Sequence, residues 1–313
     1  MDLDVLFVGT AGSAPSARRS LPATLVRRGG DRLLFDCGEG TQRQLTRSIG
    51  LVELDDVFLT HFHADHVLGL PGLIKTFSLR GRERPLTVHG PPGLTRLFRA
   101  FAPLIGRTGF ELCLVELEHG EELRRDGYRI AAFDVDHGVR ARGYALVEDA
   151  RPGRFDEARA RELGVEPGPD FGRLQRGEAV GGVAPREVLG PERPGRKVVV
   201  TGDTAPSQLV VAVAHRADLL VHEATFMAED AGRAAETHHS TAGQAGALAA
   251  EAEVGMLALT HLSARYPVRE VRDEARAAFD ATVVPDDFDR VELPLPERGG
   301  PVHHRAQAPD PSS

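Results

Sequence analysis

The sequence has no tryptophan, three tyrosines and only two cysteines in its 313 residues. Cys37 and Cys113 lie far apart along the chain, so no disulfide framework is expected, and a reducing cytoplasm is the default location. No apolar run approaches the roughly 20 residues that a membrane-spanning helix needs, so no membrane association is expected. The opening MDLDVLFVGT lacks the basic flank of a signal peptide and is expected to form a first strand.

Positive charge is also scarce. The chain carries 38 basic and 46 acidic residues, a formal net charge of −8, and its only lysines are Lys75 and Lys197. A net negative charge argues against non-specific binding to nucleic acids. It does not exclude a local basic patch, because exposed charges are screened beyond about 10 Å at ordinary salt. Arginine suits phosphate contacts better than lysine, but we attribute this preference mainly to genome composition.

What the sequence does contain is an alternation of short apolar runs and helical stretches. The apolar runs end in small or polar residues, as strands do, and lie at 3–9, 33–41, 55–66, 86–91, 128–138, 142–148, 196–204, 217–225 and 254–261. Helices are expected around 40–49, 95–105, 240–252 and 268–280. Because strands alternate with helices in both halves of the chain, the pattern predicts an α/β fold built in layers.

The most informative motif is HFHADH at residues 61–66, which follows the apolar run VFLT. In an extended segment alternate side chains point the same way, so His61 and His63 can hold one ion together. Asp65 and His66 come after the chain turns and can face a second ion. Imidazoles and carboxylates are the ligands that zinc prefers in catalytic sites, so the motif predicts a zinc centre.

Further ligands are expected at the ends of other strands, because such ends meet at one edge of an α/β sheet. Three candidates follow independent apolar runs, namely His137, Asp203 and His261. The resulting assignment is two zinc ions per chain, the first held by His61, His63 and His137, the second by Asp65, His66 and His261, with Asp203 as the bridge. Asp36 also ends a strand and is expected to orient a ligand histidine.

Two metal ions about 3.5–4 Å apart suit in-line displacement at phosphorus, since they hold a shared water as hydroxide and neutralise the phosphate. Asp65 would touch the same water and could accept its proton. The leaving oxygen needs a donor, for which His239 in HHST is the candidate, with Glu223 in HEAT to orient it and keep it protonated. A His–Glu pair near a core is as often only a packing feature, so both interpretations stay open at this point.

These motifs together resemble a known family. HFHADH, DHG at 136–138, TGDT at 201–204 and THLSARY at 260–266 are similar to the metallo-β-lactamase superfamily, and HEAT and HST narrow the resemblance to ribonuclease Z, the tRNA 3′-processing endonucleases, in their short form. The resemblance spans residues 6–294 and implies an αββα sandwich, two zinc ions and a homodimer. It implies cleavage of precursor tRNA after the discriminator nucleotide, leaving a 3′-hydroxyl, with Asp65 as proton acceptor and His239 and Glu223 at the leaving group.

One segment does not look like part of a catalytic core. EPGPDFGRLQRG at 166–177 has the composition of a linker or a surface loop. It lies within residues 151–196, which hold nine arginines and eight acidic residues in an otherwise acidic chain. The resemblance implies that this region is an arm that projects from the core and grips the tRNA elbow; the alternative is a disordered surface loop. The expected substrate contacts are Gly168, Phe171, Arg173 and Arg176.

The expected organisation is one catalytic domain in two segments, 1–150 and 197–296, an inserted arm at 151–196, and a disordered tail at 297–313. A general phosphodiesterase or arylsulfatase-like hydrolase of small anionic esters is the main alternative, because it would use the same metals without an RNA grip. A hydrolase of β-lactams or thioesters fits HEAT, HST and the insertion less well. A metal-stabilised binding module would need neither a general base nor a His–Glu pair, so it fits these motifs least.

Overall fold

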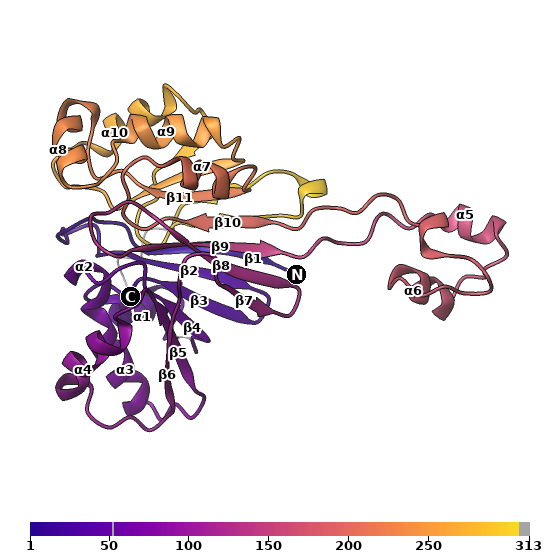
Figure 1. Ribbon diagram of the computed structural model, residues 1–313, viewed down its shortest axis with the longest axis horizontal. Coiled ribbons are helices and arrows are strands. Elements are labelled where there is room, and N and C mark those ends of the chain that lie inside the picture. The colour runs from indigo at the N-terminus through magenta and orange to yellow at the C-terminus, as the bar shows by residue number, and fades with distance from the viewer. Residues whose placement is uncertain (52, 307–313) are drawn as a thin grey trace, which may run out of the picture.

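The computed structural model describes residues 1–51 and 53–306. Two β-sheets pack face to face in the middle of the molecule, and helices cover the outer face of each, so the layers follow the order α, β, β, α (Figure 1). This is the layered α/β sandwich that the alternation of strands and helices predicts. None of the helices in the described residues is long and apolar enough to cross a membrane.

The first sheet has the strand order β15-β14-β1-β2-β3-β4-β5-β6. Its strands are β1 Leu3–Gly9, β2 Ala23–Arg28, β3 Asp31–Phe35, β4 Asp56–Phe58, β5 Leu86–Gly90, β6 Leu112–Glu116, β14 Arg290–Glu292 and β15 Val302–His304. Strands β3 to β6 run parallel to one another. The helices of this half are α1 Thr41–Ser48, α2 Ala64–Val67, α3 Gly69–Leu79 and α4 Leu94–Ile105.

The second sheet has the order β13-β12-β11-β10-β9-β8-β7. Its strands are β7 Glu122–Arg125, β8 Tyr128–Asp134, β9 Arg142–Glu148, β10 Lys197–Val200, β11 Leu219–Glu223, β12 Met256–Thr260 and β13 Thr282–Val283. Strands β8 and β9 pair antiparallel, and β10 to β13 run parallel. The helices of this half are α7 Gln208–Ala214, α8 Ala231–Glu236, α9 Ala242–Glu251 and α10 Val268–Arg276.

The central strands are apolar on both faces because both faces are covered. Val5, Phe7 and Phe58 belong to an inner core between the two sheets. A second core lies between the first sheet and its helices, where α4 contributes Phe98 and Phe101. A third lies between the second sheet and α7 to α10. Three buried layers hold the strand ends rigidly, which is what a site built on those ends requires.

Residues 149–196 form an arm that projects far from the sandwich (Figure 1). Its two extended legs pair at Arg151 with Arg193 and at Phe155 with Leu189. The tip contains the helices α5 Glu157–Glu162 and α6 Pro169–Gln175 and the 3-10 turn Pro185–Glu187. An apolar cluster of its own holds the tip together, formed by Ala160, Val165, Phe171, Leu174, Val180, Val183 and Val188.

The segment 166–177 contains a helix, although its composition suggests a loop. Pro169 is the first residue of α6, where the missing N–H of proline costs no helical hydrogen bond. Phe171 and Leu174 are three residues apart on one helix face and are buried in the cluster of the tip. Pro167, Gly168 and Pro169 therefore mark the start of a short helix and Gly177 follows its end, while Gly172 lies inside it.

A buried ion-pair network fixes the root of the arm. β9 ends at Glu148, and Arg196 immediately precedes β10 on the returning leg. Glu148 accepts hydrogen bonds from Arg28 Nε at 2.8 Å and from Arg196 Nε and Nη2 at 2.7 and 2.8 Å. All three side chains are buried. Each leg is therefore tied to the core at the residue where it leaves the sheet.

The C-terminal segment is ordered where we expected disorder at 297–313. Pro296–Arg298 forms a 3-10 turn, and Val302–His304 pairs antiparallel with β14 at the edge of the first sheet. Glu297 accepts hydrogen bonds from Arg151 and Arg193 of the arm at 2.8 and 3.0 Å. The polar composition was misleading because an existing sheet edge holds this segment. Residues 307–313 of that expectation lie outside the described residues.

Candidate metal centre and active site

Loops at one edge of the sandwich bring the seven predicted metal ligands together. Four of them follow β4, one follows β8, one follows β10 and one follows β12. They form two groups whose ligand atoms lie within 4.8 Å of one another: His61, His63, His137 and Asp203 in one, and Asp65, His66 and His261 in the other. A third group that meets the same distance limit consists of Asp203, His239 and His261, so Asp203 belongs to two groups. The first two groups bring together the residues that we expected to be ligands, with Asp203 placed in the first of them.

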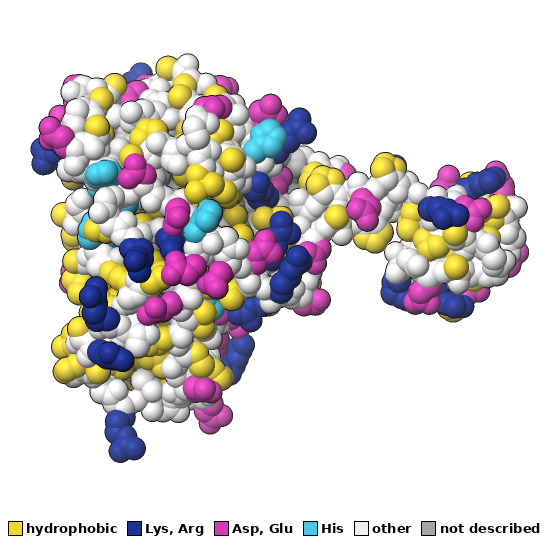
Figure 2. Space-filling model, viewed as in Figure 1, with side chains coloured by type: hydrophobic (Ala, Val, Ile, Leu, Met, Phe, Trp, Pro, Cys, Tyr) yellow, Lys and Arg dark blue, Asp and Glu magenta, His cyan; other side chains and the backbone are white. Residues whose placement is uncertain are grey.

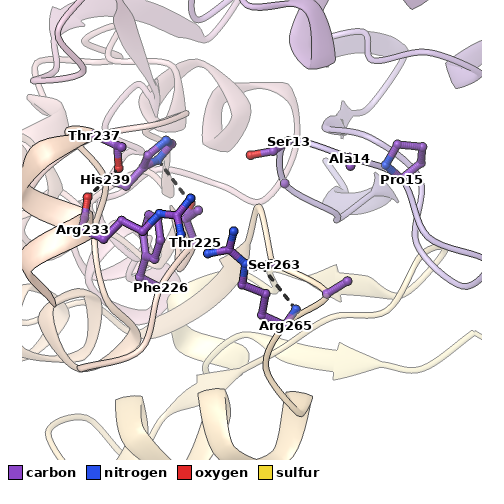
Figure 3. Close-up of a pocket in the computed structure, with 12 residues that line it drawn as sticks. Ser13, Ala14, Pro15, Thr225, Phe226, Arg233, Thr237, His239, Ser263 and Arg265 are labelled. Carbon is purple, nitrogen blue, oxygen red and sulfur yellow. Dashed lines mark hydrogen bonds between the residues drawn. The ribbon is translucent and has the colours of Figure 1, made fainter. Parts of the chain in front are cut away.

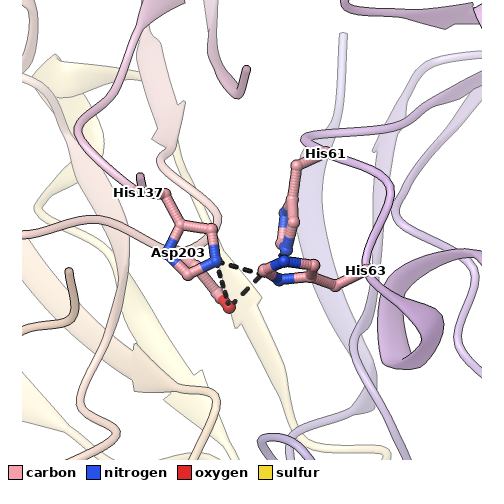
Figure 4. Close-up of side chains that lie close together, drawn as sticks. All are labelled: His61, His63, His137 and Asp203. Carbon is pink, nitrogen blue, oxygen red and sulfur yellow. Dashed lines mark hydrogen bonds and ion pairs between the residues drawn. The ribbon is translucent and has the colours of Figure 1, made fainter. Parts of the chain in front are cut away.

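In the first group three imidazoles and a carboxylate converge (Figure 4). His137 Nε2 lies 3.1 Å from His63 Nδ1. Asp203 Oδ2 lies 3.8 Å from His61 Nε2 and 3.7 Å from His137 Nε2. The group therefore offers three nitrogen donors and one oxygen donor around one small space.

The second group lies on the other side of Asp203. His261 Nε2 is 3.2 Å from Asp65 Oδ2, and His66 Nε2 is 3.6 Å from the same oxygen. Asp203 Oδ2 lies 3.3 Å from His261 Nε2 and 3.4 Å from His66 Nε2. One carboxylate oxygen is therefore within 4 Å of imidazoles from both groups, which is the position that a bridging ligand needs.

This donor set fits metal ions better than it fits hydrogen bonds. His61 Nε2, His66 Nε2 and Asp203 Oδ1 are buried and have no hydrogen-bond partner among the described residues. Buried polar atoms are rarely left unpaired in a folded protein. The donors are nitrogen and oxygen without a thiolate, as in many catalytic zinc sites.

Burial sets the protonation of most ligand histidines. It is the largest cause that lowers the pKa of His61, His63 and His137, and neighbouring imidazoles lower it further. These three rings are therefore neutral, the form that binds metal ions. Burial also acts to lower the pKa of His66, but Asp203 and a second carboxylate raise it well above its usual value. The two carboxylates beside the buried His66 ring thus favour a positive charge at this position.

The second nitrogen of four ligand imidazoles is held by a neighbour. His66 Nδ1 bonds to Asp36 at 2.8 Å, His61 Nδ1 to the Thr60 hydroxyl at 3.1 Å, His261 Nδ1 to the Thr225 hydroxyl at 2.8 Å and His137 Nδ1 to the His238 carbonyl at 3.0 Å. Such partners fix the ring and its tautomer. Asp36 lies where we expected it. Thr60 and Thr225 were not among the predicted site residues. The sequence showed only that Thr60 precedes a ligand and that Thr225 lies in HEAT.

Glu223, the last residue of β11, and His239 form a hydrogen-bonded pair beside both groups. Glu223 Oε1 accepts from His239 Nδ1 at 2.8 Å and from the Thr204 N–H at 2.7 Å, and Oε2 accepts from the Thr225 hydroxyl at 2.5 Å. Burial lowers the pKa of His239, but Glu223 raises it above the usual value. The carboxylate thus orients the ring and favours its protonated form. Helix α9 begins at Ala242, so His239 precedes the helix instead of opening it.

A loop that the sequence analysis did not assign contacts Asp65. The Ser13 N–H donates to Asp65 Oδ2 at 3.0 Å. Ser13 has a φ of 61°, a strained conformation for serine, and a Cβ added at Gly12 would lie 2.5 Å from His261 Nδ1. Burial raises the pKa of Asp65, but His261 and His66 lower it well below its usual range, so the carboxylate is ionised. The sequence signal for this loop was Gly12, because only glycine lets the backbone lie so close to the His261 ring.

A cavity of about 520 Å³ opens beside His239 (Figure 3). One wall is the loop 12–15, and the other is formed by Thr225, Phe226 and residues 263–265. Arg233 of α8 also lines the cavity. The cavity therefore adjoins both Asp65, through the Ser13 loop, and the Glu223–His239 pair. The two arginines that line the cavity, Arg233 and Arg265, were not among the predicted site residues.

The four predicted substrate contacts lie in the tip of the arm, away from the metal ligands (Figure 1). Gly168 precedes α6 with a φ of 152°. Phe171 is only 8% exposed, and its ring packs on Phe155 with the centroids 4.9 Å apart. This corrects our expectation for Phe171, because a ring inside the core of the tip stabilises the tip and presents little surface to RNA.

The arginines of the tip are paired with acids. Arg173 Nε lies 3.0 Å from Glu178 and Nη1 lies 3.3 Å from Asp170, while Arg176 Nε lies 3.4 Å from Glu178. Figure 2 shows acidic and basic side chains side by side on the tip. FGRLQRG is free of acids in sequence, but the fold brings flanking acids back to it. The tip is therefore a mixed-charge surface.

Comparison with known proteins gives a consistent picture. The model of the metallo-beta-lactamase superfamily matches residues 19–285. Ribonuclease Z of Halorubrum lacusprofundi is 47% identical over 307 residues, which cover 95% of this chain and 99% of that protein. Ribonuclease Z of Gemmatimonas aurantiaca is 46% identical, with 95% and 98% covered. Among solved structures, the short form of human tRNase Z superposes with a TM-score of 0.69 at 26% identity, covering 93% of this chain and 100% of that one.

Proposed function

The chain belongs to the ribonuclease Z family of the metallo-β-lactamase superfamily and is a metal-dependent endoribonuclease; from this premise we propose that it removes the 3′ trailer from precursor tRNA. The proposed cut lies directly after the discriminator nucleotide and leaves a 3′-hydroxyl. The observation that carries the proposal is the Glu223–His239 pair beside two ligand groups joined by Asp203. An acid beside a two-metal site suits displacement at phosphorus with an alkoxide leaving group.

The proposed metal content is two zinc ions per chain. The support is the donor set, in which imidazoles and carboxylates are divided into two groups with one shared oxygen. Buried ligand atoms without hydrogen-bond partners in both groups also support a bound cation. When bound, the two ions would activate a shared water and neutralise the attacked phosphate.

The residues of the chain supply proton transfer and orientation. Asp65, held by the Ser13 N–H, accepts the proton of the attacking water. His239, held by Glu223, gives a proton to the departing 3′ oxygen on the opposite side of phosphorus. Because both groups are fixed by neighbours before substrate arrives, neither has to reorganise during the reaction.

We propose that the arm grips the body of the tRNA. The side chains of Arg173 and Arg176 are 46% and 65% exposed. A guanidinium has five N–H donors, so pairing with Glu178 leaves donors that can bind phosphate. The glycines of the tip allow backbone amides to approach an RNA backbone closely. Contacts of this kind recognise shape more than sequence, which suits a folded RNA.

We also propose that the chain is a homodimer, as the family resemblance implies. Light scattering on the zinc-loaded protein should give twice the chain mass of 33.8 kDa. A monomer at micromolar concentration with full precursor cleavage would remove the dimer from the proposal.

The decisive experiment is incubation of the zinc-loaded protein with a 3′-extended precursor tRNA, followed by mapping of both product ends. We expect one cut after the discriminator, a 3′-hydroxyl on the tRNA and a 5′-phosphate on the trailer. Elemental analysis of the same sample should give two zinc per chain, and one zinc in fully active protein would contradict the two-metal assignment. An intact precursor with rapid hydrolysis of bis(p-nitrophenyl) phosphate would favour the alternative, a phosphodiesterase of small anionic esters.

A further inference from the structure

Two arginines meet in the cavity beside His239. Arg233 comes from α8 and Arg265 from the loop after β12, and both side chains extend toward the middle of the cavity, opposite Ser13 to Pro15 (Figure 3). Among the described residues neither forms an ion pair with a carboxylate within 4.0 Å. The guanidinium carbon of Arg233 lies 6.0 Å from the centre of the Phe226 ring, which also lines the cavity.

The chain has a net charge of −8, so acidic partners are available to its arginines. Some exposed arginines of the same half have such partners, such as Arg216 with Glu253 at 3.1 Å and Arg269 with Asp273 at 3.5 Å. Two unpaired guanidiniums on one cavity repel each other unless an anion lies between them. Arginine binds phosphate through two parallel N–H donors, so a phosphate group is the anion that this pair fits best.

The chemistry of the proposed cut indicates which phosphate that is. Water oxygen forms the new bond to phosphorus, and the bond from phosphorus to the 3′ oxygen of the discriminator nucleotide breaks. The phosphate leaves on the trailer, and the 3′ oxygen takes its proton from His239. His239 lines the cavity, so the nucleotide that carries this oxygen lies there. The next phosphate along the RNA on that side is the one 5′ of the discriminator.

We propose that Arg233 and Arg265 form a subsite for the internucleotide phosphate on the 5′ side of the discriminator nucleotide, and that this nucleotide occupies the cavity between them and His239. The inference rests on the proposed function, because it takes the cleavage position from it. A cavity of about 520 Å³ lies within the range of roughly 300–1,000 Å³ typical of small-molecule sites. The subsite would place the 3′ oxygen at His239 and so define which bond is cut.

The test uses 3′-extended minihelix RNAs in which one phosphate is replaced by a neutral methylphosphonate. With the wild-type zinc enzyme, neutralising the phosphate 5′ of the discriminator should lower kcat/KM by about 10- to 100-fold, the effect of losing charge-assisted hydrogen bonds. In Arg265→Gln and in Arg233→Gln, the native RNA should already be cut more slowly. The neutral linkage should then lower kcat/KM by only about threefold or less, because the charged partner is gone.

Three controls complete the experiment. Arg269→Gln removes an exposed arginine of α10 that does not line the cavity, and it should keep the full wild-type penalty. A methylphosphonate between the first two trailer nucleotides should give the same penalty in all four proteins. Zinc content and melting temperature of the arginine variants should match the wild type, which shows that they are folded.

The possible results distinguish a failure of the phosphate subsite from a failure of the proposed function. Equal penalties in the wild type and the arginine variants at the discriminator phosphate would overturn the subsite. A penalty that depends on the arginines only at the trailer phosphate would also overturn it and place the trailer in the cavity. If the wild-type enzyme fails to cut the unmodified precursor, the proposed function is wrong and the subsite falls with it.

Discussion

Replacing Glu223 with glutamine should separate leaving-group protonation from metal binding. Glu223 Oε1 accepts two N–H donors, from His239 and Thr204, so the amide oxygen of glutamine must take that position. The new amide NH₂ then faces the Thr225 hydroxyl, which can accept from it and still accept from His261 Nδ1. The glutamine loses the long hydrogen bond that Oε2 accepts from the Thr225 N–H at 3.3 Å, but it keeps the other contacts. The principal loss is therefore the negative charge beside His239.

The expected size of the effect follows from that single loss. A hydrogen bond to a charged partner contributes about 1.5–3 kcal/mol, which corresponds to about 10- to 100-fold in rate if it is needed in the transition state. Truncation in His239→Ala removes the proton donor itself and should lower precursor cleavage by about 10²- to 10⁴-fold. The glutamine variant should thus fall between the wild type and His239→Ala.

The assay compares two leaving groups. Precursor RNA expels an alkoxide that needs a proton, whereas bis(p-nitrophenyl) phosphate expels a stabilised phenolate that does not. We expect both variants to lose less than about tenfold on the activated ester while losing the larger factors on RNA. Glu253→Gln, an exposed glutamate paired with Arg216, is the matched control and should match the wild type on both substrates. Equal losses on the two substrates would show that the Glu223–His239 pair serves the metal groups instead of the leaving group.

Three further predictions follow. Asp65→Ala should fold, as judged by its circular dichroism, but cleave precursor at least about 10³-fold more slowly in single turnover; near-wild-type turnover would remove Asp65 from the mechanism. Replacing residues 155–190 with a short Gly-Ser loop should spare hydrolysis of bis(p-nitrophenyl) phosphate and raise the Kd for precursor by about tenfold or more, and an unchanged Kd in a filter-binding assay would leave the arm without its proposed role. Arg196 and Arg28 lower the pKa of Glu148 against the effect of burial, so its contribution to stability is present above the unfolded-state pKa and disappears as pH falls through the lower folded-state value. Glu148→Gln should therefore cost about 3–5 kcal/mol in urea unfolding at pH 7, with a difference that narrows below about pH 4; a constant difference would contradict this reasoning.

Much of the site was predictable because its signals are local. Alternation along a strand places His61 and His63 on one side, and the turn that follows places Asp65 and His66 on the other. His137, Asp203 and His261 could be added because ends of buried strands are easily recognised and meet at one edge. The strands themselves were recognisable because both of their faces are buried, which leaves continuous apolar runs such as residues 3–9.

Contacts between distant segments could not be predicted in the same way. The Ser13 N–H reaches Asp65 across 52 positions, and Thr225 reaches His261 across 36. A backbone amide has no signature in the sequence, and threonine is common enough that its position near a ligand carries little information. The strand at Val302–His304 was missed because its stability comes from the edge of β14 and not from its own polar composition.

The sequence by itself determined the family and the candidate ligands of this protein, since the types and spacing of these residues already indicate a metal-dependent hydrolase of the ribonuclease Z kind. Only the tertiary structure decided how charge is distributed around the candidate site. Asp170 and Glu178, which flank α6, already reach Arg173 and Arg176 through local helix geometry, whereas the tertiary structure left Arg233 and Arg265 without an acidic partner among the described residues beside His239. The physical reason is that an ion pair depends on distances of about 4 Å in space, which the order of residues along a chain does not contain.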